Sequence, residues 1–350
     1  MLGRCYKAEL VKLLKGKGIY IALACMLIMV IFFGVFANVY SESPLAPDEA
    51  LGIQDRLLEL IWNTPREEYD NTIKNIKDSL KQLEGDNNTS WSRFNDTKGI
   101  VLTYVSILEY LKEHEEINPN TLDLPSNSLF NLGSSSYNFL ISAFSMLLEM
   151  AMFYAIIMMS TLLVQEYREG TLKMQILRPN SRKTMLTAKW LAVMTLSTML
   201  FLFGVIVSAL FAGIHFKFTT STLLCVVNNT HVFTMNSNVF VIMQILLSLF
   251  ALFAMLMFTT FMCNIMRFNR AASMAVPIIL MVLGNFSAVL LQVVYLGMFD
   301  FMNNLNLISF FIPLGQGLPN VSLFSALPIL VTYVTIFIVV SYVKFDRAEL

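Results

Sequence analysis

The chain has 350 residues, of which 56% are hydrophobic and only 14% are charged, and its formal net charge is zero. A soluble globular domain carries about 25% charged residues, so this composition argues against a soluble protein. A neutral chain also gives no indication of a nucleic-acid partner. The hydrophobic residues form runs of about 20 residues or more, the length that crosses a ~30 Å hydrocarbon core as a helix. We therefore expect an all-α integral membrane protein with six transmembrane helices.

The first predicted element is an amphipathic helix over residues 1–17. Leu2, Tyr6 and Leu10 fall on one face of it, and its lysines lie elsewhere, which is typical of a helix lying in the membrane interface. The alternative is a basic flank that only anchors the first span. That span is predicted at 18–40, and it is too long for the apolar part of a cleaved signal peptide.

The segment 41–137 is rich in acidic residues and is predicted to form an extracytoplasmic helical domain. Two apolar stripes at helical spacing flank a turn-rich stretch at 85–90, which indicates an antiparallel helical hairpin, with a shorter helix near 48–62. The alternative is a tethered loop without fixed structure. The stripes consist of Tyr69, Ile73, Ile76, Leu80 and Leu83, and of Val101, Tyr104, Val105, Leu108 and Leu111.

The other five spans are predicted from their apolar runs, and Cys225 is assigned to a polar loop between two of them. Basic residues gather in 1–17, in the loop 165–186 and in the tail, which puts both termini in the cytoplasm. An outer re-entrant segment is expected at 298–325, where glycines and prolines interrupt the apolar sequence. The five spans are 138–164, 187–214, 238–265, 272–297 and 326–343.

The loop after the second span has the pattern of a short amphipathic helix at the membrane surface. Gly170 ends or bends the preceding helix, and Thr171 is able to cap a new one. Leu172 and Ile176 then share a face, and Pro179 ends the helix because the residue before a proline avoids helical geometry. The alternative is a surface helix that only anchors the two flanking spans.

This pattern resembles the loop of the permease subunits of ABC-2 type exporters. The six spans, the interfacial N-terminal helix and the broken segment before the last span also match that family. The long segment between spans one and two resembles its sodium-export and peptide- or antibiotic-export branches. The resemblance implies that the loop is a coupling helix that docks on a separate ATP-binding subunit. The residues it assigns to coupling are Glu166, Glu169, Gly170, Thr171, Leu172, Ile176, Leu177, Pro179 and Arg182.

The same resemblance implies a permease that is not itself an enzyme. The sequence contains no G-x-x-x-x-G-K-[ST] phosphate loop, so we expect ATP and Mg²⁺ to bind to the partner ATPase, with no cofactor in this chain. The expected assembly is a dimer with a second copy or a paralogue, two ATP-binding subunits, and a multi-pass location in a bacterial cell membrane. The expected activity is export of a peptide, an antibiotic, a lipid-like molecule or an ion.

Polar residues within the apolar runs are candidates for the transport pathway. Glu149 is the only acidic residue in such a run, where a charge costs a few kcal/mol and therefore faces protein or water, or is protonated. The alternative is a hydrogen-bonded structural group near the outer edge of the second span. Gln244, Asn285 and Gln292 are weaker candidates. The spacing of histidines and cysteines matches no metal site.

Three other functions remain open from the sequence. The first is an immunity or sensing permease that removes peptides from the membrane. The second is a non-transporting membrane scaffold or sensor that presents the outer helical domain to a partner. The third is a secondary transporter, which is disfavoured because the spans hold one acidic residue and show no obvious inverted repeat.

Overall fold

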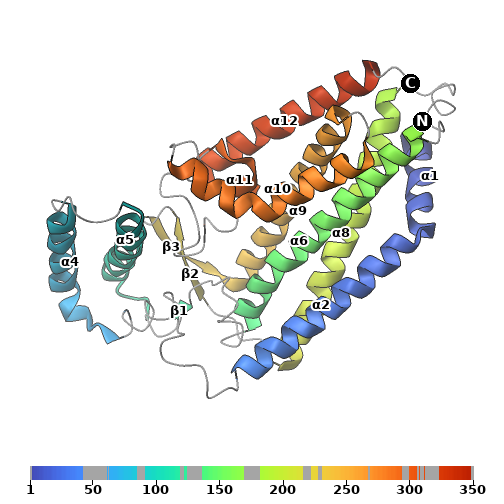
Figure 1. Ribbon diagram of the computed structural model, residues 1–350. Helices are drawn as coiled ribbons and strands as arrows, with labels where there is room; N and C mark the ends of the chain where they lie inside the picture. Colours follow the sequence, from blue (N-terminus) through green and yellow to red (C-terminus); the bar gives the residue numbers. More distant parts are fainter. Residues whose placement is uncertain are drawn as a thin grey trace.

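The protein consists of a bundle of long apolar helices with a smaller unit of helices and a sheet at one end (Figure 1). We call the end of the bundle that carries the N-terminal helix the basic end, and the end that carries the sheet the distal end. The computed structural model describes residues 2–41, 61, 63–84, 91–118, 122–123, 136–168, 182–215, 222–227, 231–266, 269–293, 299–305, 307, 311 and 323–347.

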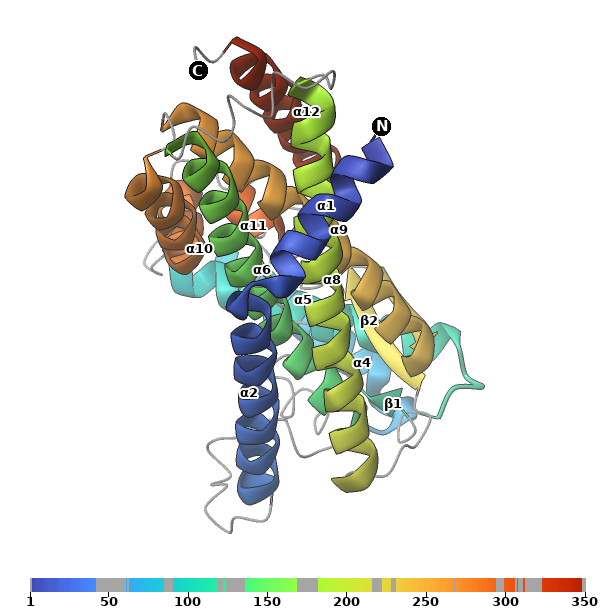
Figure 2. The same ribbon diagram turned by 90° about the vertical axis from the view of Figure 1, so that its right-hand side faces the viewer.

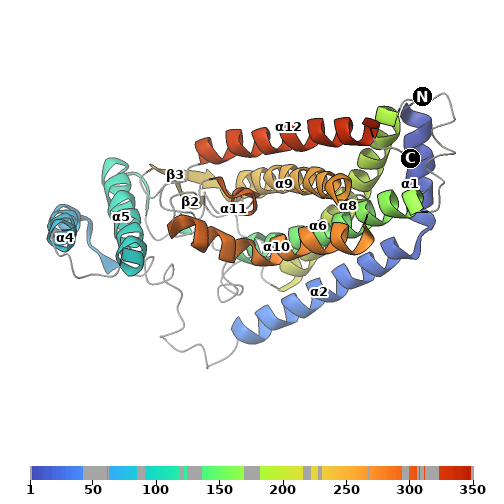
Figure 3. The same ribbon diagram turned by 45° about the horizontal axis from the view of Figure 1, so that its top comes forward.

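Three helices form the centre of the bundle and three flank them (Figure 3). The central helices pack along one another, and α2 lies on the opposite side of them from α12. Their apolar side chains form one continuous core. The central helices are α6 (Ser136–Arg168), α8 (Arg182–His215) and α9 (Ser237–Ile265), and the flanking ones are α2 (Lys17–Ser41), α10 (Arg270–Val293) and α12 (Leu323–Arg347).

Five of these helices, α2, α6, α8, α9 and α12, are long and apolar enough to cross a membrane within the part of the chain that the structure describes. The expected all-α integral membrane fold is therefore confirmed. The sixth helix, α10, stands where the sequence predicts the span 272–297, and the part of it whose side chains the structure describes holds the apolar stretch Ala271–Gly284. The count of six spans consequently remains a prediction.

The N-terminal helix α1 (Leu2–Lys15) ends at Gly16 and is followed directly by α2. It crosses α8 at the basic end of the bundle rather than continuing the line of α2 (Figure 2). Leu13 is buried there, and Tyr6 and Leu10 pack against the bundle core. The apolar face that the sequence shows thus contacts protein along part of its length, while Leu2 remains exposed.

The distal unit contains two antiparallel helices, α4 (Tyr69–Glu84) and α5 (Trp91–Glu113), preceded by the 3₁₀ turn η1 (Arg66–Glu68). Their direction follows from two ion pairs. Lys77 of α4 pairs with Glu109 of α5, and Asp70, one helix turn or more before Lys77, pairs with Lys112, which comes after Glu109. The two helices therefore run in opposite directions. The shorter helix expected near 48–62 lies almost entirely outside the described residues.

A three-stranded sheet joins this unit to the bundle, and the sequence analysis predicted no strand there. The strands β2 (Thr222–Val227) and β3 (His231–Asn236) form an antiparallel hairpin, and β1 (Leu122–Asp123) pairs with β2 in parallel. The assignment of Cys225 to a polar loop is wrong, because it lies fully buried in β2. The apolar run Thr222–Val227 has the length and the β-branched content of a buried strand.

The two faces of β2 contact different parts of the protein. Leu224 and Val226 pack in the core formed by α4 and α5, whereas Leu223, Cys225 and Val227 pack in a cluster with residues of α6 and α9. This division follows from the period of two in a strand. The sheet is therefore a shared layer between the distal helices and the membrane bundle.

The segment expected to be re-entrant, 298–325, is described only in part. A short helix, α11 (Phe301–Leu305), packs between α10 and α12 near the distal end. The hydroxyl group of Tyr333 on α12 donates a hydrogen bond to the carbonyl oxygen of Phe299 at 2.7 Å. The prolines and glycines that led to the prediction lie outside the described residues.

Candidate functional site

The predicted coupling segment connects α6 and α8, which lie side by side through the bundle (Figure 1). Glu166 belongs to the last turn of α6, and Arg182 is the first residue of α8. The remaining coupling residues lie outside the described part of the chain, and they are Glu169, Gly170, Thr171, Leu172, Ile176, Leu177 and Pro179.

The first two turns of α8 are bonded to the end of α12. The guanidinium group of Arg182 donates a hydrogen bond from Nη1 to the carbonyl oxygen of Asp346 at 2.7 Å. The hydroxyl groups of Thr187 and Tyr342 lie 2.7 Å apart, and the Tyr342 ring packs against the Trp190 ring with centroids 4.9 Å apart. A displacement of the start of α8 would therefore act on α12.

The same part of α8 is bonded to α1 on another side. The Lys189 ammonium group lies 2.7 Å from Oε1 of Glu9, and the Lys189 side chain is fully buried. The hydroxyl groups of Tyr6 and Thr195 are 3.0 Å apart. Because Tyr6 and Glu9 are one turn apart on α1, both contacts come from one face of that helix. The helix after the coupling segment is thus held between α1 and α12.

No role for Glu9 was predicted from the sequence, although the sequence contains two features that point to an ion pair. Lys189 is a cation at the start of an apolar run, and an ionisable group in such a run is almost always paired. Glu9 is an acidic residue in the basic N-terminal helix, which makes it a candidate for the partner. The sequence could have suggested this pairing, but only the packing of α1 across α8 brings the two residues together.

The structure describes the side chains of two predicted pathway residues, Gln244 and Glu149, and these two do not lie together. Gln244 is buried in α9 and donates a hydrogen bond from Nε2 to the carbonyl oxygen of Ile141 on α6 at 3.1 Å, which is a contact between packed helices. Glu149 is exposed on α6, eight residues and so about 12 Å further along that helix. Asn285 and Gln292 belong to α10, and their side chains lie outside the description.

The described residues contain no group of three or more His, Cys, Asp or Glu side chains that could hold a metal ion. Two of the histidines stack on aromatic rings instead. His114 lies against Tyr110 with ring centroids 4.3 Å apart, and His215 lies against Phe211 at the same distance. These side chains therefore contribute to packing.

The protein-family comparison matches residues 7–350 to the family described as "ABC-2 family transporter protein". The searches of curated proteins and of solved structures both found no match. The family match begins within α1 and includes all the other long helices and the distal unit. Members of this family are membrane-spanning permease subunits, and they normally work with a separate ATP-binding subunit. The chain belongs to the ABC-2 transporter family.

Proposed function

We propose that this permease exports its substrate by using ATP hydrolysis in separate subunits that dock on the segment 165–186. The substrate classes that fit are a peptide, an antibiotic, a lipid-like molecule or an ion. The observation that carries this proposal is the anchoring of α8 immediately after the coupling segment, in a chain whose family match covers residues 7–350. ATP and Mg²⁺ would bind to the partner, and this chain would supply the pathway.

The contacts around α8 supply a route for the coupling force. A push on the coupling segment acts on both helices that it connects, α6, which ends at Arg168, and α8, which begins at Arg182. From there the bond between Lys189 and Glu9 acts on α1, and the contacts of Tyr342 act on α12. Packed helices respond to such a push by shifting as rigid elements between two arrangements. We infer that α1, α8 and α12 move together when the ATPase closes.

The proposed assembly is a dimer of this chain with a second copy or a paralogue, bound to two ATP-binding subunits. Both termini and the coupling segment would lie in the cytoplasm of a bacterial cell. The basic residues near these segments support this orientation. The distal unit would then lie on the outer side, where one face of its sheet packs against residues of α6 and α9.

Leu172→Asp tests the docking. Apolar anchors carry most of the energy of an interface, often about 2 kcal/mol or more each. An unpaired carboxylate in that contact is costly, so we expect the variant to insert normally but to lose the ATPase, or to hydrolyse ATP without transport. The measurements are copurification in mild detergent, and ATPase and transport activity in reconstituted vesicles.

Asn180→Asp is the matched control, because it adds the same charge to the loop without changing its apolar face. It should retain both the partner and transport. Leu172→Asp with normal copurification and normal transport would overturn the coupling assignment. A chain that copurifies with no ATP-binding subunit would favour the non-transporting scaffold.

A further inference from the structure

The carboxylate group of Glu149 lies on an exposed face of α6, and we propose that it binds the cationic group of the exported molecule. The substrate is then a cationic amphiphile, which is an apolar molecule or segment that carries an ammonium or similar group. The proposal rests on the export function above and selects among its substrate classes. It is carried by the position of Glu149, by the lack of a counter-ion for it in the described chain, and by the residues around it.

Glu149 is far from both ends of its helix. It lies thirteen residues, or about 20 Å, from Ser136 and nineteen residues, or about 28 Å, from Arg168. Helix α6 is long and apolar enough to cross a membrane, yet Glu149 is exposed on its surface. A carboxylate in such a helix is costly against lipid and is found paired with another group or facing water. Glu149 therefore needs a partner.

The described part of the chain offers Glu149 no counter-ion. Among these residues it forms no hydrogen bond or ion pair. The basic residues of the described membrane helices lie near the helix ends. The one furthest from an end, Lys189, is seven residues or about 10 Å from the start of α8, and it is paired with Glu9. A second copy of the chain has the same basic residues at the same depths. The cation therefore comes from another molecule.

Ser145 adds a second oxygen on the same face of α6. It precedes Glu149 by four residues, which places the two side chains one above the other on the helix. The Ser145 hydroxyl group donates a hydrogen bond to the carbonyl oxygen of Ser142 at 2.9 Å, so its own oxygen remains an acceptor. An ammonium group has three donors and no acceptor. Hydrogen bonds between ionised groups are about twice as strong as neutral ones, so this pair selects a cation.

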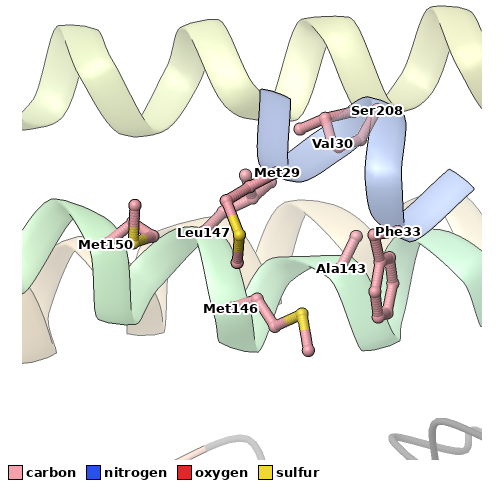
Figure 4. Close-up of a pocket in the computed structure, with 8 residues that line it drawn as sticks. All are labelled: Met29, Val30, Phe33, Ala143, Met146, Leu147, Met150 and Ser208. Atoms are coloured by element: carbon pink, nitrogen blue, oxygen red, sulfur yellow. The ribbon is translucent and has the colours of Figure 1, made fainter. Parts of the chain in front are cut away.

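The residues around Glu149 are apolar. Met146 and Met150 lie before and after it on α6, and they line one apolar surface with Met29 of α2 (Figure 4). Phe153, one turn after Glu149, is half-buried. Methionine is flexible and adapts to ligands of irregular shape, and an aromatic ring attracts a cation to its face. These residues fit an apolar body joined to a cationic group, rather than a hydrated inorganic ion.

The charge of the whole chain favours outward movement of a cation. Basic residues gather at the basic end, whereas the segment 41–137 carries 17 acidic and 8 basic residues. In the proposed orientation this acidic segment is on the outer side. A cation released from Glu149 towards the outside therefore leaves the positive end and approaches the negative one. An anionic substrate would be repelled along the same route.

The test compares two probes that differ in charge, dodecylamine and dodecanol, each with a diazirine close to its polar group. The permease–ATPase complex in phosphatidylcholine vesicles at pH 7 is photolysed with each probe without ATP, and labelled residues are identified by mass spectrometry. Label is normalised to Ile242, which is 60% exposed on α9. We expect the amine to label Met146, Met150 and Phe153 about tenfold more than the alcohol does. Equal labelling by the two probes would overturn the proposal.

Two variants of Glu149 identify the group that selects the amine. Glu149→Gln should lower the amine label to the level of the alcohol label, whereas Glu149→Asp keeps the charge and should retain the preference. A preference that persists in Glu149→Gln contradicts the assignment. A permease pair that separates in Glu149→Gln but not in Glu149→Asp would show that the carboxylate binds the other permease chain, and this result also overturns the proposal.

The labelling requires no ATP hydrolysis, so this proposal and the export function fail separately. Normal copurification and transport by Leu172→Asp would overturn the coupling assignment whichever probe labels α6. Equal labelling by the two probes would overturn the cation site whatever Leu172→Asp does. If both proposals hold, the amine stimulates ATP hydrolysis by the complex, the alcohol does not, and Glu149→Gln abolishes the stimulation. An amine that labels α6 without changing ATP hydrolysis would overturn its assignment as a substrate analogue.

Discussion

The carboxylate group of Glu9 lies 2.7 Å from the ammonium group of Lys189, and this pair joins the interfacial helix to the membrane helix that follows the coupling segment. The Lys189 side chain is fully buried, and the Glu9 side chain is 13% exposed. The second oxygen of Glu9, Oε2, is buried and has no hydrogen-bond partner among the described residues. Such a pair is a poor source of stability, but it specifies which face of α1 packs on α8.

Breaking this pair from one side should destabilise the protein strongly. Glu9→Ala removes the carboxylate opposite a fully buried ammonium group, and loss of one partner of a buried pair costs about 3 to 5 kcal/mol. We expect a lower Tm in detergent and weaker coupling of ATP hydrolysis to transport. The Tm is measured on the purified protein in detergent, and the coupling is measured on the complex in reconstituted vesicles.

The double variant Glu9→Gln with Lys189→Met distinguishes the cost of an unpaired buried charge from the cost of lost side-chain packing. It removes both charges, so it should recover much of the Tm lost in Glu9→Ala, because the two changes are coupled. Lys7→Ala, at an exposed position on the same helix, is the control and should change little. If the double variant were as unstable as Glu9→Ala, the loss of stability would not come from the unpaired charge.

The sequence predicted the long helices well, because a run of apolar residues with few charges has one structural solution in lipid. It did not predict the link between Glu9 and Lys189, since their contact depends on the crossing of α1 over α8. It also missed the strand that contains Cys225. The periodicity of a short apolar run does not distinguish a strand from a buried helix, and here the length and β-branched content of the run indicate the strand that pairs with β3.

Cys225 provides a test of the buried sheet. Burial raises the pKa of its thiol to about 12, and the nucleophile in alkylation is the thiolate. In a background with no other cysteine, Cys225 should resist maleimide at pH 8 until the protein unfolds. Thr222→Cys in a cysteine-free chain, at the exposed start of the same strand, is the control and should react readily. Rapid labelling of Cys225 in the folded protein would contradict the strand.

The same pKa shift predicts how stability depends on pH. In the folded protein the Cys225 thiol has a pKa of about 12, whereas in the unfolded protein it has its ordinary pKa of 9.0. The unfolded state therefore binds fewer protons between these values, and the free energy of unfolding falls as the pH rises through them. Cys225→Ala should remove this contribution. Denaturation of both proteins at pH 8 and pH 10 measures the difference.

The orientation of the chain is tested by labelling from outside the cell. Single cysteines at Ser90, in the turn-rich stretch of the distal segment, and at Ser181, in the coupling loop, are introduced into a cysteine-free chain. An impermeant thiol reagent should label the first in intact cells and the second only after the membrane is opened. Equal labelling of both positions in intact cells would overturn the proposed topology.

Glu149 lies well inside α6. It is thirteen residues, or about 20 Å, from Ser136, where that helix begins. The residue is nevertheless exposed on the surface of α6. A carboxylate at this depth is costly against lipid, so we infer that it faces a second permease chain or a water-filled pathway.

Glu149→Gln tests this role while keeping the size of the side chain. If the carboxylate contacts a substrate or an ion in the pathway, transport should fall while membrane abundance and binding of the ATPase remain normal. Ile157→Gln places the same amide at another exposed position on α6 and should transport normally. Unchanged transport by Glu149→Gln would assign the residue to structure alone. Loss of the Glu149→Gln protein from the membrane would also indicate a structural role, because it would show that folding or insertion needs the carboxylate.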